Sequence, residues 1–294
     1  MTRSGRRVME PAASPAPGTP ASAGAGAPAT AGAEAGVAAG AAAAVRLAGA
    51  AKTFRGRRED VRALDPIDLT VPAGEFVAIV GPSGCGKSTL LRIVAGLMDA
   101  DAGGRVEVQG RPVDGTPPDL GVVFQTHNLL PWRTIEANVG LGARLAGIPK
   151  AEVARRVPSM LEMLGLSGFA RKHPHELSGG MRQRAALGQA LVCRPEILLL
   201  DEPFGALDAL TRDRLNVELL KIWQELRQTV LLVTHSIAEA VFLADRIIVM
   251  SQRPGAVVED IRVDIPRPRD PATTRALPEF TETAQRLSRL MGVT

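Results

Sequence analysis

Short apolar runs alternate with helical periods along most of this chain, from about residue 45 onward. Residues 45–48 and 67–71 alternate apolar and polar positions, which is typical of half-buried strands. Residues 76–80 are apolar throughout, which indicates a central strand buried on both faces. Similar short runs predict further strands at residues 105–108, 121–124, 196–200, 229–233 and 246–250.

Helical periods fill the intervals between these strands. Helices are predicted over residues 88–97, 181–191, 210–227 and 237–243, with a weaker one near 280–291. Between residues 134 and 178, two helical pieces are separated by the breakers Gly147 and Pro149. Their apolar positions, three and four residues apart, are Leu141, Leu145, Val153, Val157, Leu161 and Leu164. Strands that alternate with helices predict an α/β fold, with a mostly parallel sheet covered by helices on both faces.

Composition divides the chain into three regions. Residues 1–44 are almost entirely Ala, Gly, Pro, Ser and Thr, so we expect a disordered tail. Arg6 and Arg7 are followed by prolines instead of an apolar segment, so no export signal is expected. Residues 45–265 form the expected folded domain, with the helical insertion at about 130–180. Residues 266–294 are a C-terminal extension.

Charge and cysteine content narrow the classes of partner. The net charge is +4, its Lys and Arg residues are scattered, and aromatic residues are scarce, so nucleic acid is not an expected partner. The 2 cysteines cannot form a disulfide framework. No apolar run approaches the ~20 residues of a membrane-spanning helix. If the protein acts at a membrane, another protein must provide the spanning segments.

A glycine loop between a predicted strand and a predicted helix carries the strongest chemical signal. The loop matches the phosphate-binding pattern G-x-x-x-x-G-K-[ST]. Its glycines allow successive backbone amides to surround phosphate groups. Lys87 is expected to reach the β- and γ-phosphates, and Ser88 to bind Mg²⁺. The expected nucleotide-binding residues are Gly81, Pro82, Ser83, Gly84, Cys85, Gly86, Lys87, Ser88 and Thr89.

Two adjacent carboxylates end the predicted strand at residues 196–200. We expect Asp201 to hold Mg²⁺, directly or through water, and Glu202 to act as the general base that polarises the attacking water. Taken alone, an acidic pair after a strand is more often a solvated strand end. The spacing after the glycine loop and the following Pro203 favour the catalytic interpretation.

Six motifs occur in one order. They are the glycine loop, Gln125, the segment Leu-Ser-Gly-Gly-Met-Arg-Gln-Arg at 177–184, the acidic strand at 197–203, Ala-Leu-Asp at 206–208, and His235. In this order the chain resembles the ATP-binding subunit of an ABC transporter over roughly residues 45–265. The resemblance implies a phosphate-loop ATPase core with an antiparallel β subdomain and the helical insertion. It also implies a homodimer in which residues of two chains hold each ATP.

Several residue roles follow from this resemblance alone. Ser178, Gly179, Gly180 and Gln183 are expected to face the γ-phosphate of an ATP held by the opposite subunit. Ser178 is also a good N-cap for the helix that it precedes. Asp208 lies in the loop that passes information between the two ATP sites.

Three further roles compete with simpler explanations. Gln125 is expected to contact Mg²⁺ and water, although a Gln after a strand is normally just an exposed polar residue. His235 is expected to contact the γ-phosphate and position the water at Glu202, although a lone His at a strand end is usually structural. Phe54 is expected to stack on adenine, and the alternative is an ordinary core aromatic.

The chain is also similar to a particular group within this family, the nitrate, sulfonate and taurine importers. The similar segments are 125–132, 203–208, 253–255 and 266–271. This resemblance implies a location at the cytoplasmic face of the membrane, permease subunits as partners, and an extracytoplasmic solute-binding protein as an indirect partner. The expected permease contact comprises His127, Leu129, Leu130 and Trp132. In the alternative interpretation, Trp132 fills the interior of the helical insertion.

Other functions and features stay open at the level of sequence. A soluble ABC ATPase that acts on nucleic acid or ribosomes is the main alternative function, and an exporter ATPase is another. The chain departs from the family at Gly188, where a helix interior usually has Ala. His173 and His175 form a pair without an evident third ligand, so no metal site is expected there.

Overall fold

The structure is a computed structural model that describes residues 42–57, 59–205 and 207–292. The expected disordered tail lies outside the described residues up to residue 41. Strand β1 (Ala43–Phe54) begins one residue before the expected end of that tail at residue 44. Ala43 belongs to the strand because its backbone pairs with Pro72 across the adjoining strand.

A six-stranded sheet forms the centre of the fold, and it confirms the predicted α/β class. Its order is β10-β9-β3-β8-β7-β6, with β10 antiparallel to β9 and the other neighbours parallel. Successive residues of a strand point to opposite faces, so Phe76 and Ala78 enter one core cluster and Val77 and Ile79 the other. The strands are β3 (Phe76–Val80), β6 (Leu120–Val123), β7 (Ile197–Asp201), β8 (Thr229–Val233), β9 (Arg246–Met250) and β10 (Val257–Arg262).

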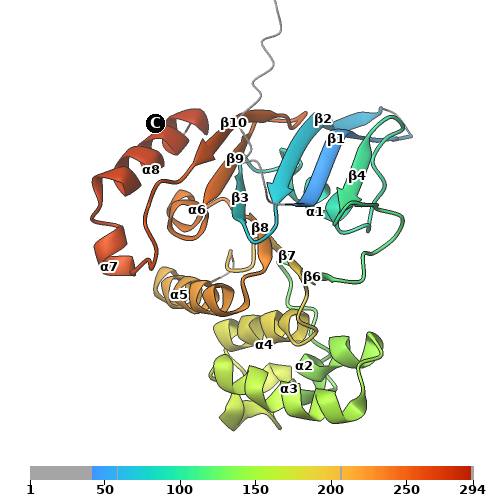
Figure 1. The fold of residues 1–294 in the computed structure, drawn as a ribbon, viewed down its shortest axis with the longest axis vertical. Helices are drawn as coiled ribbons and strands as arrows, with labels where there is room; N and C mark the ends of the chain where they lie inside the picture. The colour runs from blue at the N-terminus through green and yellow to red at the C-terminus, as the bar shows by residue number, and fades with distance from the viewer. Residues whose placement is uncertain (1–41, 58, 206, 293–294) are drawn as a thin grey trace, which may run out of the picture. The chain divides into compact units, whose positions relative to one another are not determined.

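One face of this sheet is covered by helix α1 (Lys87–Val94) and a second sheet. The second sheet is antiparallel, with the order β2-β1-β4-β5. Its other strands are β2 (Val61–Pro72), β4 (Arg105–Val108) and β5 (Arg111–Pro112). The long β1–β2 hairpin turns at the polar segment after Phe54, and this sheet lies at the upper right of Figure 1. It is the antiparallel β subdomain that the resemblance implied.

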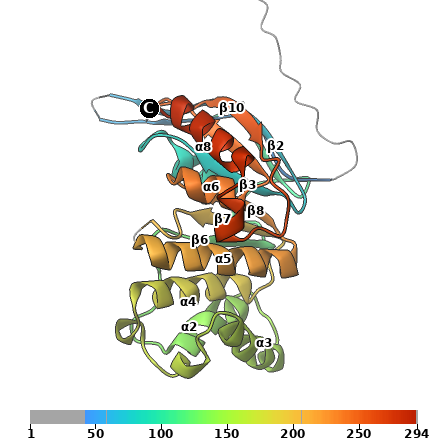
Figure 2. The same cartoon turned by 90° about the vertical axis from the view of Figure 1, so that its left-hand side faces the viewer.

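The opposite face of the central sheet carries the helical part of the chain. Helices α2, α3 and α4 lie together at the bottom of Figures 1 and 2. Helices α5 and α6 lie above them, toward the antiparallel sheet. No helix of the described chain is both long and apolar enough to span a membrane. The helices are α2 (Ile135–Leu145), α3 (Lys150–Met163), α4 (Gly179–Leu191), α5 (Ala209–Leu226) and α6 (Ile237–Leu243), with 3₁₀ turns at Ser167–Phe169 and Pro174–Glu176.

Two details of the helical part differ from the sequence pattern. Leu145, which was expected to follow the apolar face, is 79% exposed, since it lies in the last turn of α2. Packing explains why the chain has glycine at position 188, because a Cβ at this position of α4 would approach Leu164 Cδ1 to 2.6 Å. The glycine therefore lets the segment after α3 pack closely against α4.

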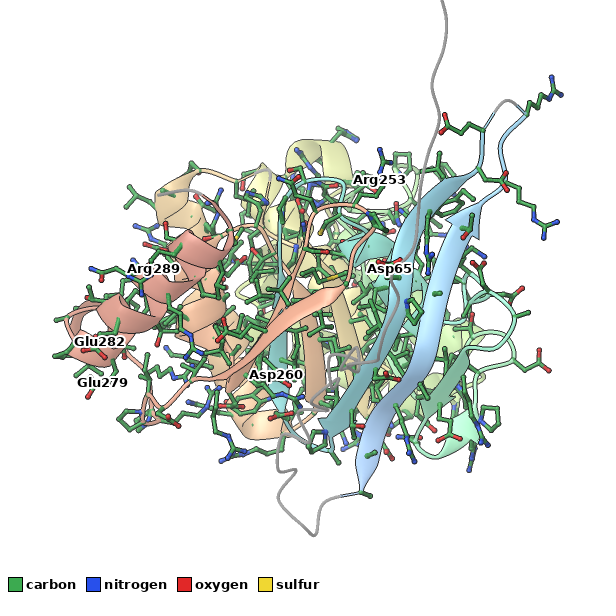
Figure 3. The ribbon with its side chains drawn as sticks, turned by 90° about the horizontal axis from the view of Figure 1, so that it is seen from above. Asp65, Arg253, Asp260, Glu279, Glu282 and Arg289 are labelled. Carbon is green, nitrogen blue, oxygen red and sulfur yellow. The ribbon has the colours of Figure 1, made fainter. Side chains whose placement is uncertain are left out.

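The C-terminal extension packs back onto the core. It contains α7 (Pro271–Thr274) and α8 (Pro278–Leu290), and Phe280 and Leu287 of α8 join the main core cluster. Figure 3 labels the side chains of Glu279, Glu282 and Arg289 on α8, and all three residues are exposed at a hollow that α8 shares with β10. The edge strand β10 and helix α7 were not predicted.

Arg269 fastens this extension to the end of α6. Its side chain is 1% exposed and donates hydrogen bonds to the carbonyls of Val241, Phe242, Ala244 and Ile265 at 2.8–3.3 Å. Burial, together with the neighbouring Arg267 charge, lowers the pKa of Arg269 to about 10. The guanidinium therefore stays charged at neutral pH and satisfies carbonyls that the end of a helix leaves without partners.

We expect Arg269→Ala to lower the free energy of unfolding by about 3–5 kcal/mol, because it leaves several buried carbonyls unpaired. Arg269→Lys should recover little of this loss, since an ammonium lacks the planar fork of a guanidinium. The measurement is urea unfolding followed by circular dichroism. Arg289→Ala, on the exposed side of α8, is the control and should change stability by less than about 0.5 kcal/mol.

Candidate ATP site

Four strand ends bring the expected chemical residues to one edge of the central sheet. β3 leads into the glycine loop, β7 ends at Asp201, β8 leads to His235, and Gln125 follows β6. These four strands are parallel neighbours in the order β3-β8-β7-β6, so their carboxyl ends lie side by side. In open α/β sheets, ligands bind outside the carboxyl ends of the strands.

The glycine loop turns around the Lys87 ammonium. Lys87 is 5% exposed, and its Nζ donates to the carbonyls of Gly81 at 2.8 Å and Pro82 at 3.0 Å. Gly86, the N-cap of α1, has a φ of 106°, and a Cβ there would come within 2.5 Å of Leu64 Cδ2. Only glycine fits this turn. The ammonium and the helix N-terminus together make a site suited to phosphate.

Ser88 and Asp201 lie together beside this loop. The Ser88 hydroxyl donates to Asp201 Oδ1 at 2.7 Å. Burial raises the pKa of Asp201, while the Ser88 hydrogen bond and the Arg92 charge oppose the rise. A hydroxyl and a buried carboxylate are hard oxygen donors of the kind that Mg²⁺ binds. The donor set therefore fits the expected metal ion.

Glu202 lies at the centre of the site in a constrained conformation. Its φ is 45°, a left-handed value that costs a non-glycine residue about 1–3 kcal/mol. The backbone amide of Glu202 donates to the Val233 carbonyl at 2.9 Å, which holds this turn against β8. Glu202 Oε2 accepts from Gln125 Nε2 at 3.4 Å and lies 3.3 Å from His235 Nδ1. The geometry thus groups the three residues around one carboxylate.

The Leu-Ser-Gly-Gly segment opens α4, as predicted. Ser178 is the N-cap and accepts a hydrogen bond from the Met181 amide at 3.4 Å. Asp208 caps α5 in the same way, accepting from Thr211 at 3.0 Å, and these Thr211 hydrogen bonds lower the pKa of Asp208. Ala206 lies outside the described residues. Within the described chain, no hydrogen bond links Ser178 to the glycine loop.

Gln183 departs from the expected nucleotide contact. Its side chain is 1% exposed, and Oε1 lies 2.6 Å from His127 Nδ1. The side chain therefore joins α4 to the loop after Gln125 and is closed off from a ligand at the helix end. His127 is partly buried by the same contact, and its predicted role at a permease stays a prediction.

Phe54 lies at the end of β1 and is 40% exposed. An ordinary core aromatic would be covered, so that alternative does not describe this side chain. Lys52 Nζ lies 6.0 Å from the ring centroid. The ring is free to stack on a planar ligand.

The loop before α2 presents an indole to solvent. Trp132 is 71% exposed, which excludes the alternative in which it fills the helical insertion. The loop is held by the buried side chain of Asn138, which accepts from the Leu130 amide at 2.7 Å and donates to the carbonyls of Leu130, Arg133 and Thr134 at 3.0–3.1 Å. Leu129 and Leu130 are partly covered. The tryptophan is therefore displayed by a rigid loop.

Sequence reasoning missed two buried polar residues near the site, Asn138 and Glu239. Asn138 falls at a position where the period of α2 calls for an apolar side chain, and that mismatch was the available signal. Glu239 follows His235 by four residues on α6, and no pattern in the sequence marked it. Among the described residues no group of three or more His, Cys, Asp or Glu side chains forms a metal-binding cluster, His173 and His175 included.

Comparisons with known proteins agree with the motif order. A family model described as ABC transporter matches residues 64–205. The chain is 49% identical over 238 residues to an uncharacterized ABC transporter ATP-binding protein of Methanocaldococcus jannaschii, covering 81% of this chain and 86% of that protein. It is 42% identical to the nitrate import ATP-binding protein of a Synechocystis strain, covering 82% and 92%. It is 46% identical to the aliphatic sulfonates import ATP-binding protein of Bacillus licheniformis, covering 76% and 85%.

Solved structures give the same answer for the fold. The chain resembles a dimeric ATP-binding cassette in a post-hydrolysis state, bound to ADP and Pi. The TM-score is 0.66 at 34% sequence identity, and the match covers 74% of this chain and 98% of that one.

Proposed function

The chain belongs to the ABC transporter family as an ATP-binding, ATP-hydrolysing subunit, and we propose that it drives uptake of a small anion through a separate permease. The anion is of the class of nitrate, sulfonates or taurine, for which close relatives are named. The observation that carries this proposal is the convergence of the glycine loop, Gln125, Asp201, Glu202 and His235 at one sheet edge, with the exposed Trp132 loop following Gln125 directly.

The glycine loop binds the phosphates of ATP in this proposal. Backbone amides at the start of α1 and the Lys87 ammonium face the anionic groups, and Phe54 stacks on the adenine. Ser88, Asp201 and Gln125 are the residues that would hold Mg²⁺. When bound, the ion neutralises charge that develops on the phosphates.

Glu202 activates the attacking water. Its carboxylate accepts hydrogen bonds, so it can orient a water molecule and take its proton as the general base. His235 and Gln125 limit where the carboxylate points, because both approach the same oxygen, Oε2. The left-handed backbone at Glu202 serves the same end, since it directs the side chain away from the continuation of β7.

A second copy of the chain completes each ATP site. Ser178 and the amides behind it open α4 and are not bonded to the glycine loop of their own chain among the described residues. In the proposed homodimer, Ser178, Gly179 and Gly180 reach the γ-phosphate held by the partner, and Asp208 lies at the same interface. The dimeric cassette that the chain resembles supports this arrangement.

Transport requires partners that span the membrane. The proposed location is the cytoplasmic face of the membrane, where Trp132 with Leu129 and Leu130 contacts a permease subunit. A solute-binding protein on the other side of the membrane delivers the anion to the permease. The anion does not contact this chain.

Purification of the tagged protein from native membranes in mild detergent, followed by mass spectrometry, tests this function. We expect a multi-span permease together with a solute-binding protein, whose ligand can then be identified by thermal-shift screening with nitrate, sulfonates and taurine. Recovery with ribosomes or nucleic acid, and without any membrane subunit, would contradict the transport function while leaving the ATPase activity in place.

Trp132→Ala should abolish anion uptake and leave the ATPase activity of the isolated subunit within about twofold of the unchanged chain. An exposed aromatic side chain at the centre of a contact contributes about 2 kcal/mol or more to binding, but nothing to a fold that leaves it in solvent. Leu145→Ala is the control, because Leu145 is an apolar side chain of similarly high exposure, 79% against 71%, in the same helical part. Uptake assays in cells that express each variant measure the difference. Equal loss in both variants would argue against a specific Trp132 contact.

A further inference from the structure

The link between β8 and α6 consists of three residues, Thr234, His235 and Ser236. The His235 side chain is about half exposed, and its Nδ1 lies 3.3 Å from Glu202 Oε2. An exposed imidazole is directed mainly by its backbone, since few neighbours hold the ring. Whatever fixes the flanking residues therefore fixes the direction of His235.

The flanking residues are both tied to Glu239. The Thr234 hydroxyl donates a short hydrogen bond to Glu239 Oε2 and accepts one from the Ser236 amide at 3.0 Å. The Ser236 hydroxyl in turn accepts from the Glu239 amide at 3.3 Å. These three hydrogen bonds close a ring that runs around His235 without including its side chain. We call this ring the histidine brace, and it consists of Thr234, Ser236 and Glu239.

Glu239 is almost fully buried, with 4% exposure, inside the protein behind the brace. Burial raises the pKa of its carboxyl, and the Thr234 hydrogen bond and the Arg212 and His235 charges oppose the rise only in part. Asn216 of α5 lies beside this carboxyl, and a side-chain hydrogen bond between the two opposes the rise as well.

We propose that Glu239 is a positioning residue for His235, acting through the Thr234 and Ser236 hydrogen bonds rather than by contact with nucleotide. Its carboxyl is buried and bonded to Thr234, so it is closed off from direct contact with a bound nucleotide. The inference rests on the proposed role of His235 at Glu202. It adds a residue outside the six motifs to the machinery that aligns the attacking water.

The test compares Glu239→Ala and Glu239→Gln in the full chain, each with and without His235→Ala. We expect Glu239→Ala to lower kcat for ATP about 10- to 100-fold with KM for ATP little changed, because misplacement without lost binding acts on the chemical step. Glu239→Gln keeps the shape of the side chain and an oxygen that accepts from the Thr234 hydroxyl, so it should restore kcat to within about threefold. In the His235→Ala background, Glu239→Ala should produce no further loss.

Thr234→Val and Thr234→Ser provide an independent pair that leaves the buried carboxyl in place. Val removes the hydroxyl from the brace and should lower kcat, whereas Ser keeps the hydroxyl and should not. Thermal unfolding of every variant accompanies the kinetics. A loss of kcat that tracks the unfolding temperature, or that is equal with and without His235, would overturn the proposal.

The same variants test the roles of His235 and Glu239 separately. If His235→Ala lowers kcat but Glu239→Ala does not, the positioning role alone is wrong. If His235→Ala leaves kcat unchanged, the role of His235 at Glu202 is wrong, and the positioning role falls with it.

Discussion

Glu202→Gln should bind ATP and hydrolyse it at least about a hundredfold more slowly than the unchanged chain. A glutamine keeps the size of the side chain but cannot take a proton from water, and a positioned general base contributes about 10²–10⁴-fold to such a reaction. Because the ATP-bound dimer is no longer resolved by hydrolysis, we also expect it to accumulate. Phosphate release gives the rate, and size-exclusion chromatography with ATP gives the dimer.

Glu225→Gln is the control for this experiment. Glu225 is an exposed carboxylate near the C-terminal end of α5 and belongs to none of the motifs of the site, so its amide variant should keep full turnover. A Glu202→Gln protein with ordinary turnover would show that another group takes the proton. Unchanged thermal unfolding in both variants would exclude a loss of fold as the cause of any difference.

The strands that were predicted from sequence are those whose burial is complete. β3, β7 and β8 are buried at every position, so runs of four or five apolar residues predicted them. β10 was missed because it lies at the edge of the sheet and buries only Ile261, while Glu259 and Asp260 keep its sequence polar. A strand of this kind is defined by its pairing with β9, a neighbour that local periodicity does not reveal.

Within the site, the order of the motifs predicted which residues would lie close together at the sheet edge. It did not predict the orientation of their side chains. Gln183 follows Ser178 by five residues, and at about 100° per residue it lies on another side of α4 from the residues at the helix start. Its side chain consequently faces His127 in the interior. The left-handed backbone of Glu202 was equally unpredictable, because any L-residue other than glycine normally avoids that region.

The C-terminal extension shows a third reason why prediction stopped short. The sequence predicted only a weak helix near residues 280–291 in this segment, yet arginines fix the segment to the core. Arg267 binds Asp245 and lies over the Trp223 ring at 4.2 Å, and Arg275 forms a two-pronged ion pair with Asp213 at 2.6 and 2.8 Å. These ion pairs and ring contacts join residues that are far apart in the sequence, so the spacing of residues along the chain does not reveal them.

Mixing Ser178→Arg subunits with Lys87→Ala subunits should restore ATPase activity that neither variant has alone. In the proposed dimer, each site takes Lys87 from one chain and Ser178 from the other. A mixed dimer then has one site with both residues intact and one with both altered. Random pairing makes half of the dimers mixed, so roughly a quarter of the ATP sites should be intact.

This result separates a shared site from a site built within one chain. If each chain used its own Ser178 and Lys87, every site in the mixture would carry a substitution and no activity would return. Full activity would equally contradict the shared arrangement. Ser178→Arg alone should still bind ATP, because the glycine loop of the same chain makes no hydrogen bond with Ser178 within the described residues. Equilibrium binding of a fluorescent ATP analogue to that variant checks this step, and loss of binding would mean that the substitution damages the glycine loop itself.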